Sequence, residues 1–255
     1  MGSEMCIRDR FIDYARETNT SSSLLFVDLI QAFASMIRKV CLRDPSGDEQ
    51  WLIALGDAGI PEDEVREIYH AISQIEWLEE DPHTGTCYTD SYPFAFAASV
   101  YRNSWFSTEG LVNVVKTNRG SGAGTPLADI IFALTMSRVL VVLREHLEAA
   151  GFTASLGGGR HNNIPIHDIS YHDDLVIPCV AAANELVDKT AAVASITFEV
   201  FIYFGFRLNF TKGKTEAIAL FAGKGSTAAS KQLYRDGQTA AVITGGTTDV
   251  LRFVS

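Results

Sequence analysis

Three aspartates could together hold divalent metal ions for phosphoryl transfer. Asp28 closes the apolar segment LLFVD, and Asp173 and Asp174 are adjacent within SYHDDLV. Transfer of a nucleotide to a growing strand uses two metals about 3.5–4 Å apart, which activate the attacking hydroxyl and stabilise the leaving oxygen. Mg²⁺ prefers carboxylate, water and phosphate oxygens, so this chemistry needs two or three carboxylates converging from different strands. Each acid also has a plainer interpretation, because an Asp-Asp pair is commonly a turn and an Asp after a strand is commonly a helix cap.

Two segments are predicted to position these acids. The apolar run from Leu24 to Leu29 predicts a short buried strand that ends in an acid. Residues 168–179, DISYHDDLVIPC, predict two short strands that meet at a tight turn on the acid pair. If these strands are neighbours in one sheet, the acids meet at one edge of it. We then expect the carboxylates of Asp28 and Asp173 to face one another, with Asp174 adjacent.

Helices are predicted to back this sheet. Thr125 is suited to the N-cap and Pro126 to the first turn of a helix that ends at Ala150, before Gly151. A second helix is predicted over 181–204 and ends at Gly205. One face of it carries a stripe of residues that should be buried, namely Leu186, Thr190, Val193, Thr197 and Phe201.

The predicted fold class is α+β, with a small antiparallel sheet backed by helices. The other elements we expect are helices at 31–42, 51–58 and 61–77 and strands at 207–210 and 216–221. The chain after Gly223 is small and polar, and we expect it to be poorly ordered.

The charge is unevenly distributed. The chain of 255 residues has a net charge of −10, but residues 44–92 hold thirteen acids against one base, Arg66, which leaves +2 for the rest. We expect this acidic segment to face away from any nucleic acid and the basic stretch 207–235 to lie nearer to it, because carboxylates repel phosphates. No apolar run reaches the roughly 18 residues of a membrane span. The four cysteines form no CxxC pair, so we expect a reduced intracellular setting, nucleus or cytoplasm.

Four sequence blocks follow one another in an order that is much more specific than any one of them. They are FVDLIQAFASM at 26–36, RGSGAGTPLADIIF at 119–132, YHDD at 171–174 and GFRLNFTKGKTEAI at 205–218. In this order they resemble the reverse transcriptases of non-LTR, LINE-type retrotransposons, especially the divergent versions in dinoflagellate transcripts. That family's blocks have an apolar strand and Asp followed by Ala-Phe, then RGxxQGDPLSPLLF, a paired-aspartate block and GLxLNxxKTE. The resemblance covers about four-fifths of the chain.

The resemblance implies an RNA-directed DNA polymerase, a nucleotidyltransferase that uses an RNA template, a DNA primer, deoxynucleoside triphosphates and Mg²⁺, with Mn²⁺ as an alternative. Asp28 and Asp173 match its metal ligands, and Asp174 matches an auxiliary ligand. Phe33 matches the bulky residue that excludes a ribose 2′-hydroxyl, and Lys214 matches a lysine that neutralises or protonates the leaving pyrophosphate. The nucleotide- and template-binding block and the tyrosine before the acid pair match at Arg119, Gly120, Gly124, Pro126 and Tyr171. Glycine in that block allows close approach of the backbone to a ligand.

Several residues depart from the family pattern, and two rival functions follow. Ala123 stands where a glutamine is common and Thr125 where an acid or serine is common, although every metal ligand is kept. The first rival is therefore a catalytically inactive palm that binds RNA or another protein. The second is a metal-dependent phosphodiesterase, which would need further ligands such as His161 or His167. Phe33 could equally be a core aromatic, and Lys214 a solvated loop lysine.

The resemblance also divides the chain into parts. Residues 1–10, MGSEMCIRDR, match nothing downstream and look like translated sequencing adapter. Residues 11–255 would be a partial reverse transcriptase domain, with palm at 21–43 and 119–221 and a fingers insertion at 44–118. A tail at 222–255 would lead toward a primer grip and thumb. Since those parts and the N-terminal fingers strands would be absent, we expect a fragment that binds template-primer weakly and extends it barely or not at all.

Overall fold

The computed structural model describes residues 11–35, 61, 105–106, 115–116, 120, 126–156, 164–171 and 174–254. The chain divides into two compact units. The first unit contains the main sheet and comprises residues up to Ile30, Met136–Phe201 and the chain from Arg207 onward. The second comprises Gln31–Thr135 and Ile202–Phe206. The predicted helices at 51–58 and 61–77, and the acidic segment 44–92, lie outside the described residues apart from Pro61.

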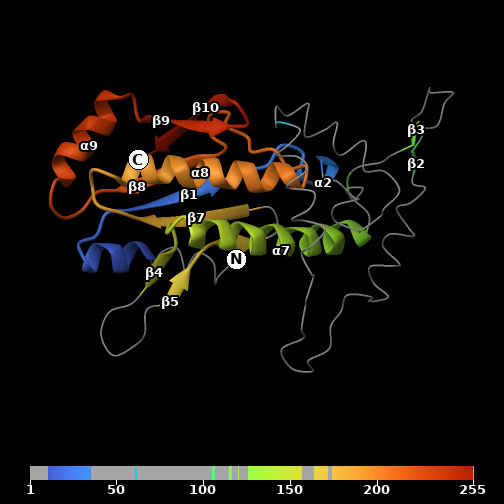
Figure 1. The fold of residues 1–255 in the computed structure, drawn as a ribbon, viewed down its shortest axis with the longest axis horizontal. Helices are drawn as coiled ribbons and strands as arrows, with labels where there is room; N and C mark the ends of the chain where they lie inside the picture. Colours follow the sequence, from blue (N-terminus) through green and yellow to red (C-terminus); the bar gives the residue numbers. More distant parts are fainter. Residues whose placement is uncertain are drawn as a thin grey trace. The chain divides into compact units, whose positions relative to one another are not determined.

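Six strands form one mixed sheet in the first unit (Figure 1). Neighbouring strands are antiparallel, except that β10 runs parallel to β8. In spatial order they are β6 (Ile169–Tyr171), β7 (Asp174–Val180), β1 (Ser22–Val27), β8 (Glu216–Leu220), β10 (Thr247–Val254) and β9 (Thr239–Thr244). The α+β class is confirmed, and the sheet is larger than the predicted one and not wholly antiparallel.

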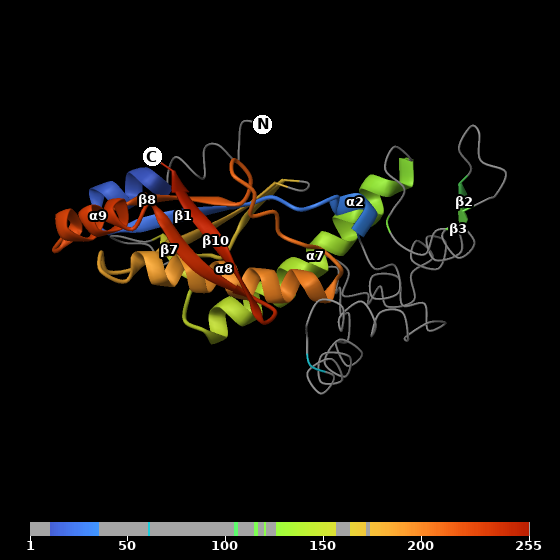
Figure 2. The ribbon, with the colours of Figure 1, turned by 90° about the horizontal axis from the view of Figure 1, so that it is seen from above.

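One face of this sheet is covered by two long helices. Helix α8 (Leu186–Tyr203) and the part of α7 (Pro126–Ala149) that belongs to the first unit lie on the same side of the strands (Figure 2). The Ser23 and Thr190 hydroxyls are 2.6 Å apart between β1 and α8, so odd-numbered residues of β1 face α8. The predicted stripe of α8 is confirmed, because all five of its residues are fully buried: Leu186, Thr190, Val193, Thr197 and Phe201.

The predicted boundaries of the two long helices agree with the structure to within one residue, except at the start of α8. Helix α7 starts at Pro126 and ends next to the predicted stop, where Gly151 has φ +69° and donates its N–H to the Glu148 carbonyl. Helix α8 ends before Gly205, whose φ is +88°. It begins five residues later than predicted, because residues 181–182 belong to no helix or strand and residues 183–185 form a turn. Both glycines adopt the left-handed conformation that typically ends a helix.

The described residues that cover the opposite face of the sheet lie at one end of it. A helix at residues 11–17 brings Phe11 against Leu24 of β1, together with Ala154 of the short hairpin β4 (Ala154–Leu156) and β5 (Ile164–Ile166). Further along the strands, Phe26 and Val176 are only half-buried. On this face the even-numbered residues of β1 become more exposed along the strand, from the buried Leu24 to the half-buried Phe26. Asp28 follows at the more exposed end.

The C-terminal segment was predicted to be poorly ordered, and this prediction was wrong. Residues 226–254 form helix α9 (Ser226–Arg235) and the β9–β10 hairpin, which turns at Gly245 and Gly246 with φ of 52° and 85°. A few apolar residues anchor it, and they are spread among small polar ones, which obscured their alternation in the sequence. They are Leu233, Val242, Leu251 and Phe253.

The described part of the second unit contains an aromatic cluster. Phe33 of α2 (Ala32–Ser35) stacks on Phe132 of α7, with ring centroids 4.4 Å apart, and Phe206 meets Phe132 edge-on at 5.9 Å. A short strand pair, β2 (Trp105–Phe106) and β3 (Val115–Lys116), also belongs to this unit. Helix α2 is the described part of the helix predicted at 31–42.

Across the described ranges, no helix is long and apolar enough to cross a membrane.

The core of the first unit can be tested with two valine substitutions. Val193→Ala removes two methyl groups from a fully buried site on α8 and should lower the free energy of unfolding by about 2 kcal/mol. Val141→Ala is the matched control, because Val141 lies on α7 and is 49% exposed. It should change stability by only a few tenths of a kcal/mol, since alanine is the better helix former. Urea unfolding followed by circular dichroism measures both, and equal losses would contradict the packing described here.

Candidate active site

The site begins with two acids at the same end of adjacent strands. Strands β1 and β7 are antiparallel, with Val27 opposite Leu175, so continuing the register by one residue sets Asp28 opposite Asp174. Directly opposed residues point to the same face of a sheet, here the more open one. The Asp28 side chain is 35% exposed and Asp174 is exposed. The last pair of β1 and β7 thus leaves two acids that are far apart in the sequence at the same end of adjacent strands.

The predicted hairpin on the acid pair is confirmed in its strands. Tyr171, the last residue of β6, pairs with Asp174, the first of β7, so only two residues connect them. Those two residues, His172 and Asp173, lie outside the described part of the chain. The expected approach of Asp173 to Asp28 accordingly stays a prediction.

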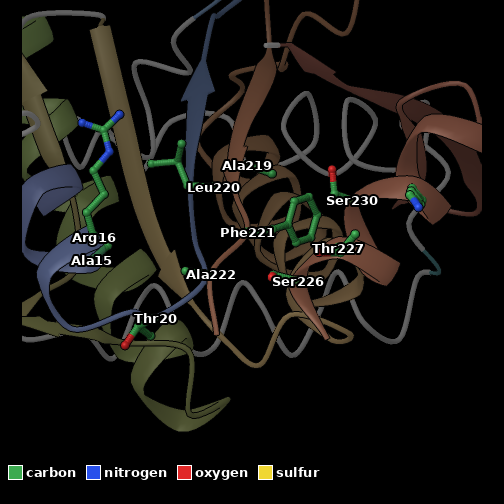
Figure 3. A pocket seen from close by; sticks show the side chains of 11 residues that line it. Ala15, Arg16, Thr20, Ala219, Leu220, Phe221, Ala222, Ser226, Thr227 and Ser230 are labelled. Carbon is green, nitrogen blue, oxygen red and sulfur yellow. The ribbon is translucent and has the colours of Figure 1, made fainter. Parts of the chain in front are cut away.

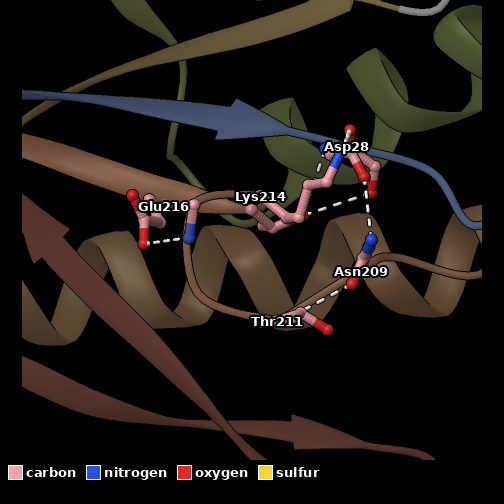
Figure 4. Close-up of polar contacts among 7 residues, drawn as sticks. Asp28, Asn209, Thr211, Lys214 and Glu216 are labelled. Atoms are coloured by element: carbon pink, nitrogen blue, oxygen red, sulfur yellow. Dashed lines mark hydrogen bonds and ion pairs between the residues drawn. The ribbon is translucent and has the colours of Figure 1, made fainter.

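A loop after α8 surrounds Asp28 with polar partners (Figure 4). The side-chain amide of Asn209 donates to Asp28 Oδ2 at 3.0 Å, and Lys214 Nζ lies 3.4 Å from Oδ1. The Asn209 backbone N–H donates to the Asp28 carbonyl at 2.9 Å. The Thr215 hydroxyl accepts from the Asp28 N–H at 3.1 Å and donates to its carbonyl at 3.2 Å. Both the backbone and the carboxylate of Asp28 are thus held by residues 209–215.

The loop itself is closed by local hydrogen bonds. Thr215 is fully buried and its N–H donates to the Asn209 carbonyl at 2.8 Å. Gly213, at φ +81°, donates its N–H to Glu216 Oε1 at 2.7 Å. A strand was predicted at 207–210. The structure has only an isolated β-bridge there, between Leu208 and Leu29, just before the loop.

Lys214 lies beside an acid rather than free in solvent. Its ammonium forms an ion pair with Asp28, although 186 positions separate them. With side chains 50% and 35% exposed, this pair contributes little to stability. Its effect is to bring a positive charge to the acids. Asn209 and Thr215 were not among the predicted site residues, and the signal that could have found them is their position in the same sequence block as Lys214.

The donor set fits Mg²⁺ or Mn²⁺ in kind. Asp28 and Asp174 offer carboxylate oxygens, which are the ligands that hard divalent cations prefer. Within the described ranges no group of three His, Cys, Asp or Glu residues is gathered closely enough to hold a metal. A third carboxylate would have to come from Asp173. His167, which the phosphodiesterase alternative would require, instead lies 2.6 Å from Glu148 of α7 and precedes β6 at the strand end away from Tyr171.

Two of the predicted nucleotide-site residues in the second unit, Phe33 and Gly120, make internal contacts. The half-buried Phe33 ring stacks on the fully buried Phe132. Gly120 has φ +77°, and a β-carbon added there would lie 2.7 Å from the Phe33 carbonyl oxygen and 2.8 Å from Ala34 Cα. Close packing against the α2 backbone is thus enough to require glycine at this position. Pro126 is the first residue of α7, and Arg119 and Gly124 lie outside the described residues.

A pocket of about 550 Å³ lies at the other end of the sheet (Figure 3). It is lined by the end of β8, the start of α9 and the helix at 11–17, including Arg16, Phe221 and Ser226. Leu220, which also lines it, pairs with Ser22 at the start of β1, whereas Asp28 follows the end of β1. The pocket is therefore separate from the acid site.

Comparison with known proteins adds no family to these observations. No protein-family model matches the chain, and no curated protein matches it significantly.

The strand that leads to the acid pair is anchored by an ion pair whose acid is buried and whose arginine is 44% exposed. Arg144 of α7 donates to both carboxylate oxygens of Asp168, at 2.6 and 3.1 Å, just before β6. The hydrogen bonding to Asp168 raises the pKa of Arg144 further above its ordinary value. The Asp168 side chain is 2% exposed, so removal of its partner would leave an unpaired buried carboxylate.

Arg144→Met should consequently cost about 1.5–3 kcal/mol of unfolding free energy. Arg16→Met is the control, because Arg16 lies 3.7 Å from Asp13 with both side chains 67% exposed. It should cost less than about 0.5 kcal/mol. Urea denaturation measures both variants, and a loss for Arg144→Met no larger than for Arg16→Met would show that the bridge does not anchor β6.

The packing role of Gly120 can be separated from its backbone conformation. Gly120→Ala should destabilise the protein by roughly 3 kcal/mol or more, from left-handed strain plus a clash with backbone that cannot move aside. Gly213→Ala, at the similar φ of +81° with nothing within 4 Å, should cost only about 1 kcal/mol. Thermal unfolding compares the two, and equal costs would rule out the close contact with α2.

Proposed function

We propose that this chain is part of the palm and fingers of an RNA-directed DNA polymerase of the non-LTR retrotransposon type. It would transfer deoxynucleotides to a primer with two divalent metals. The observation that carries the proposal is the register of β1 and β7, whose last pair, Val27 with Leu175, leaves Asp28 and Asp174 as the next residues at the same end of the sheet. Two-metal transfer requires such convergence of acids from different strands. The order of the four sequence blocks supports the same activity independently.

The two faces of the sheet support this proposal as well. Helices α7 and α8 cover the face that carries Leu25 and Val27, while the acids belong to the more open face. A polymer substrate needs an accessible surface beside the reacting groups. In this proposal the template and primer would lie along the open face.

Each residue of the site has a role in the proposed reaction. Asp28, Asp173 and Asp174 would hold the metals. When bound, Mg²⁺ would activate the primer hydroxyl and stabilise charge on the leaving pyrophosphate. Lys214, a half-exposed ammonium 3.4 Å from Asp28, could supply a proton or a positive charge to that pyrophosphate. In the second unit, Phe33 matches the family's residue that excludes a ribose 2′-hydroxyl, and its stacking on Phe132 would hold the ring in place.

The test is primer extension on an RNA template with deoxynucleoside triphosphates and Mg²⁺. Polymerisation needs the primer held in line with the incoming nucleotide, and a misplacement of about 1 Å can cost about a hundredfold. The assay therefore compares the 255-residue chain with a longer form of its parent polypeptide that adds N-terminal fingers, primer grip and thumb. We expect little extension by the first and Mg²⁺-dependent extension by the second.

Asp28→Asn in the longer form should reduce extension by at least about a hundredfold, because even changes outside the direct metal ligands cost 10–100-fold. Asp188→Asn serves as the control, since Asp188 is an exposed acid in the first turn of α8. It should leave the rate unchanged. A correctly folded longer form without any extension would refute the proposed activity and favour a palm that binds RNA or protein without catalysis.

A further inference from the structure

Asn209 is joined to Asp28 by its backbone and by its side chain. The backbone N–H of Asn209 donates to the Asp28 carbonyl at 2.9 Å, and its side-chain amide donates to Asp28 Oδ2 at 3.0 Å. The two residues are 181 positions apart in the sequence. The double connection fixes the distance between the two backbones and the direction of the carboxylate together.

The orientation of the Asn209 amide is determined by a third group. The Thr211 backbone N–H donates to Asn209 Oδ1 at 3.2 Å (Figure 4). An N–H must face an acceptor, so the amide oxygen lies toward Thr211 and the amide nitrogen toward Asp28. The opposite orientation would set the Asn209 oxygen against a carboxylate oxygen. The network therefore permits one arrangement of the Asn209–Asp28 pair.

Thr215 holds the same aspartate from its backbone. Its hydroxyl accepts from the Asp28 N–H and donates to the Asp28 carbonyl, at 3.1 and 3.2 Å. Since Thr215 is fully buried, this hydroxyl is shielded from competing water. Asp28 lies just beyond the last strand pairing of β1, and here the hydroxyl takes the place of a strand partner.

We propose that Asn209 is a positioning residue for Asp28, which it holds in the orientation needed to bind a divalent metal. The inference rests on the proposed function, because it assumes that Asp28 is a metal ligand. A neutral amide orients a carboxylate without cancelling the negative charge that attracts the metal. Lys214 Nζ already lies 3.4 Å from Asp28 Oδ1, and a second cation at position 209 would weaken that attraction further. Hydrogen bonds of this kind to metal-binding carboxylates typically change metal affinity 10–100-fold.

Mn²⁺ binding to the 255-residue chain tests the inference without any polymerisation. Free Mn²⁺ is followed by electron paramagnetic resonance during a titration. Asn209→Ala should weaken Mn²⁺ binding about 10- to 100-fold, and Asp28→Ala, which removes the ligand itself, should weaken it further and leave only residual binding. Asn209→Leu has a similarly branched, slightly larger side chain and no donor. An equal loss of Mn²⁺ affinity in Asn209→Ala and Asn209→Leu would therefore come from the missing hydrogen bond and not from a cavity. Circular dichroism confirms folding in each case.

Two controls separate positioning from a general structural effect. Asn19→Ala removes a comparable asparagine bond at the other end of the sheet, where Asn19 Oδ1 accepts from the Gly223 N–H at 3.1 Å. It should leave Mn²⁺ affinity unchanged. In an Asp28→Ala background, Asn209→Ala should cause no further loss, because the residue acts only through Asp28.

The outcomes distinguish the inference from the proposed function. Normal Mn²⁺ affinity in folded Asn209→Ala and Asn209→Leu, with only residual binding in Asp28→Ala, would overturn the positioning role alone. Undiminished binding in Asp28→Ala would overturn the metal role of Asp28 and the inference with it. A further loss from Asn209→Ala in the Asp28→Ala background would mean that Asn209 acts through another group.

Discussion

The register of β1 is the constraint on which the rest of the first unit depends. This strand pairs with β7 on one side and β8 on the other, so its position fixes three strands at once. Because strand side chains alternate, a slip of one residue would turn Asp28 toward the face covered by α8. The buried side chain of Leu25 and the Ser23–Thr190 hydrogen bond oppose that slip, since both belong to the covered face. Core packing thereby determines which face carries the acid.

The polar groups of the two faces differ according to what covers them. Beneath α8, Ser23 and Thr190 satisfy each other as neutral hydroxyls, and burial raises the pKa of the Cys179 thiol, which favours its uncharged form. A charge would be costly there without a partner. On the open face Asp28 keeps partial contact with solvent and adds hydrogen bonds from Asn209 and the nearby charge of Lys214. The Asp28 carboxylate thus has polar and charged partners as well as partial contact with water, unlike the polar groups beneath α8.

Local sequence patterns predicted helices α7 and α8 and the acid hairpin, because their signals lie within a few residues. The stripe of α8 and the Pro126 start of α7 are of this kind. The parallel pairing of β10 with β8 could not be predicted from the sequence, because it depends on long-range packing of a few apolar residues such as Leu251. The Asn209 and Thr215 contacts with Asp28 span more than 180 positions, and only the folded chain brings them together.

Gly120 and Asn209 differ in what their contacts explain. The backbone of α2 comes so close to Gly120 that packing alone requires glycine there, so the glycine needs no bound nucleotide to account for it. Packing gives no comparable reason for the bonds to the Asp28 carboxylate. That carboxylate is 35% exposed, and water could satisfy it at little cost in stability. The Asn209 amide and the Lys214 ammonium nonetheless both contact the Asp28 carboxylate. These contacts restrict the position of the carboxylate more than folding requires. Restricted positioning is what a ligand of a reacting metal needs.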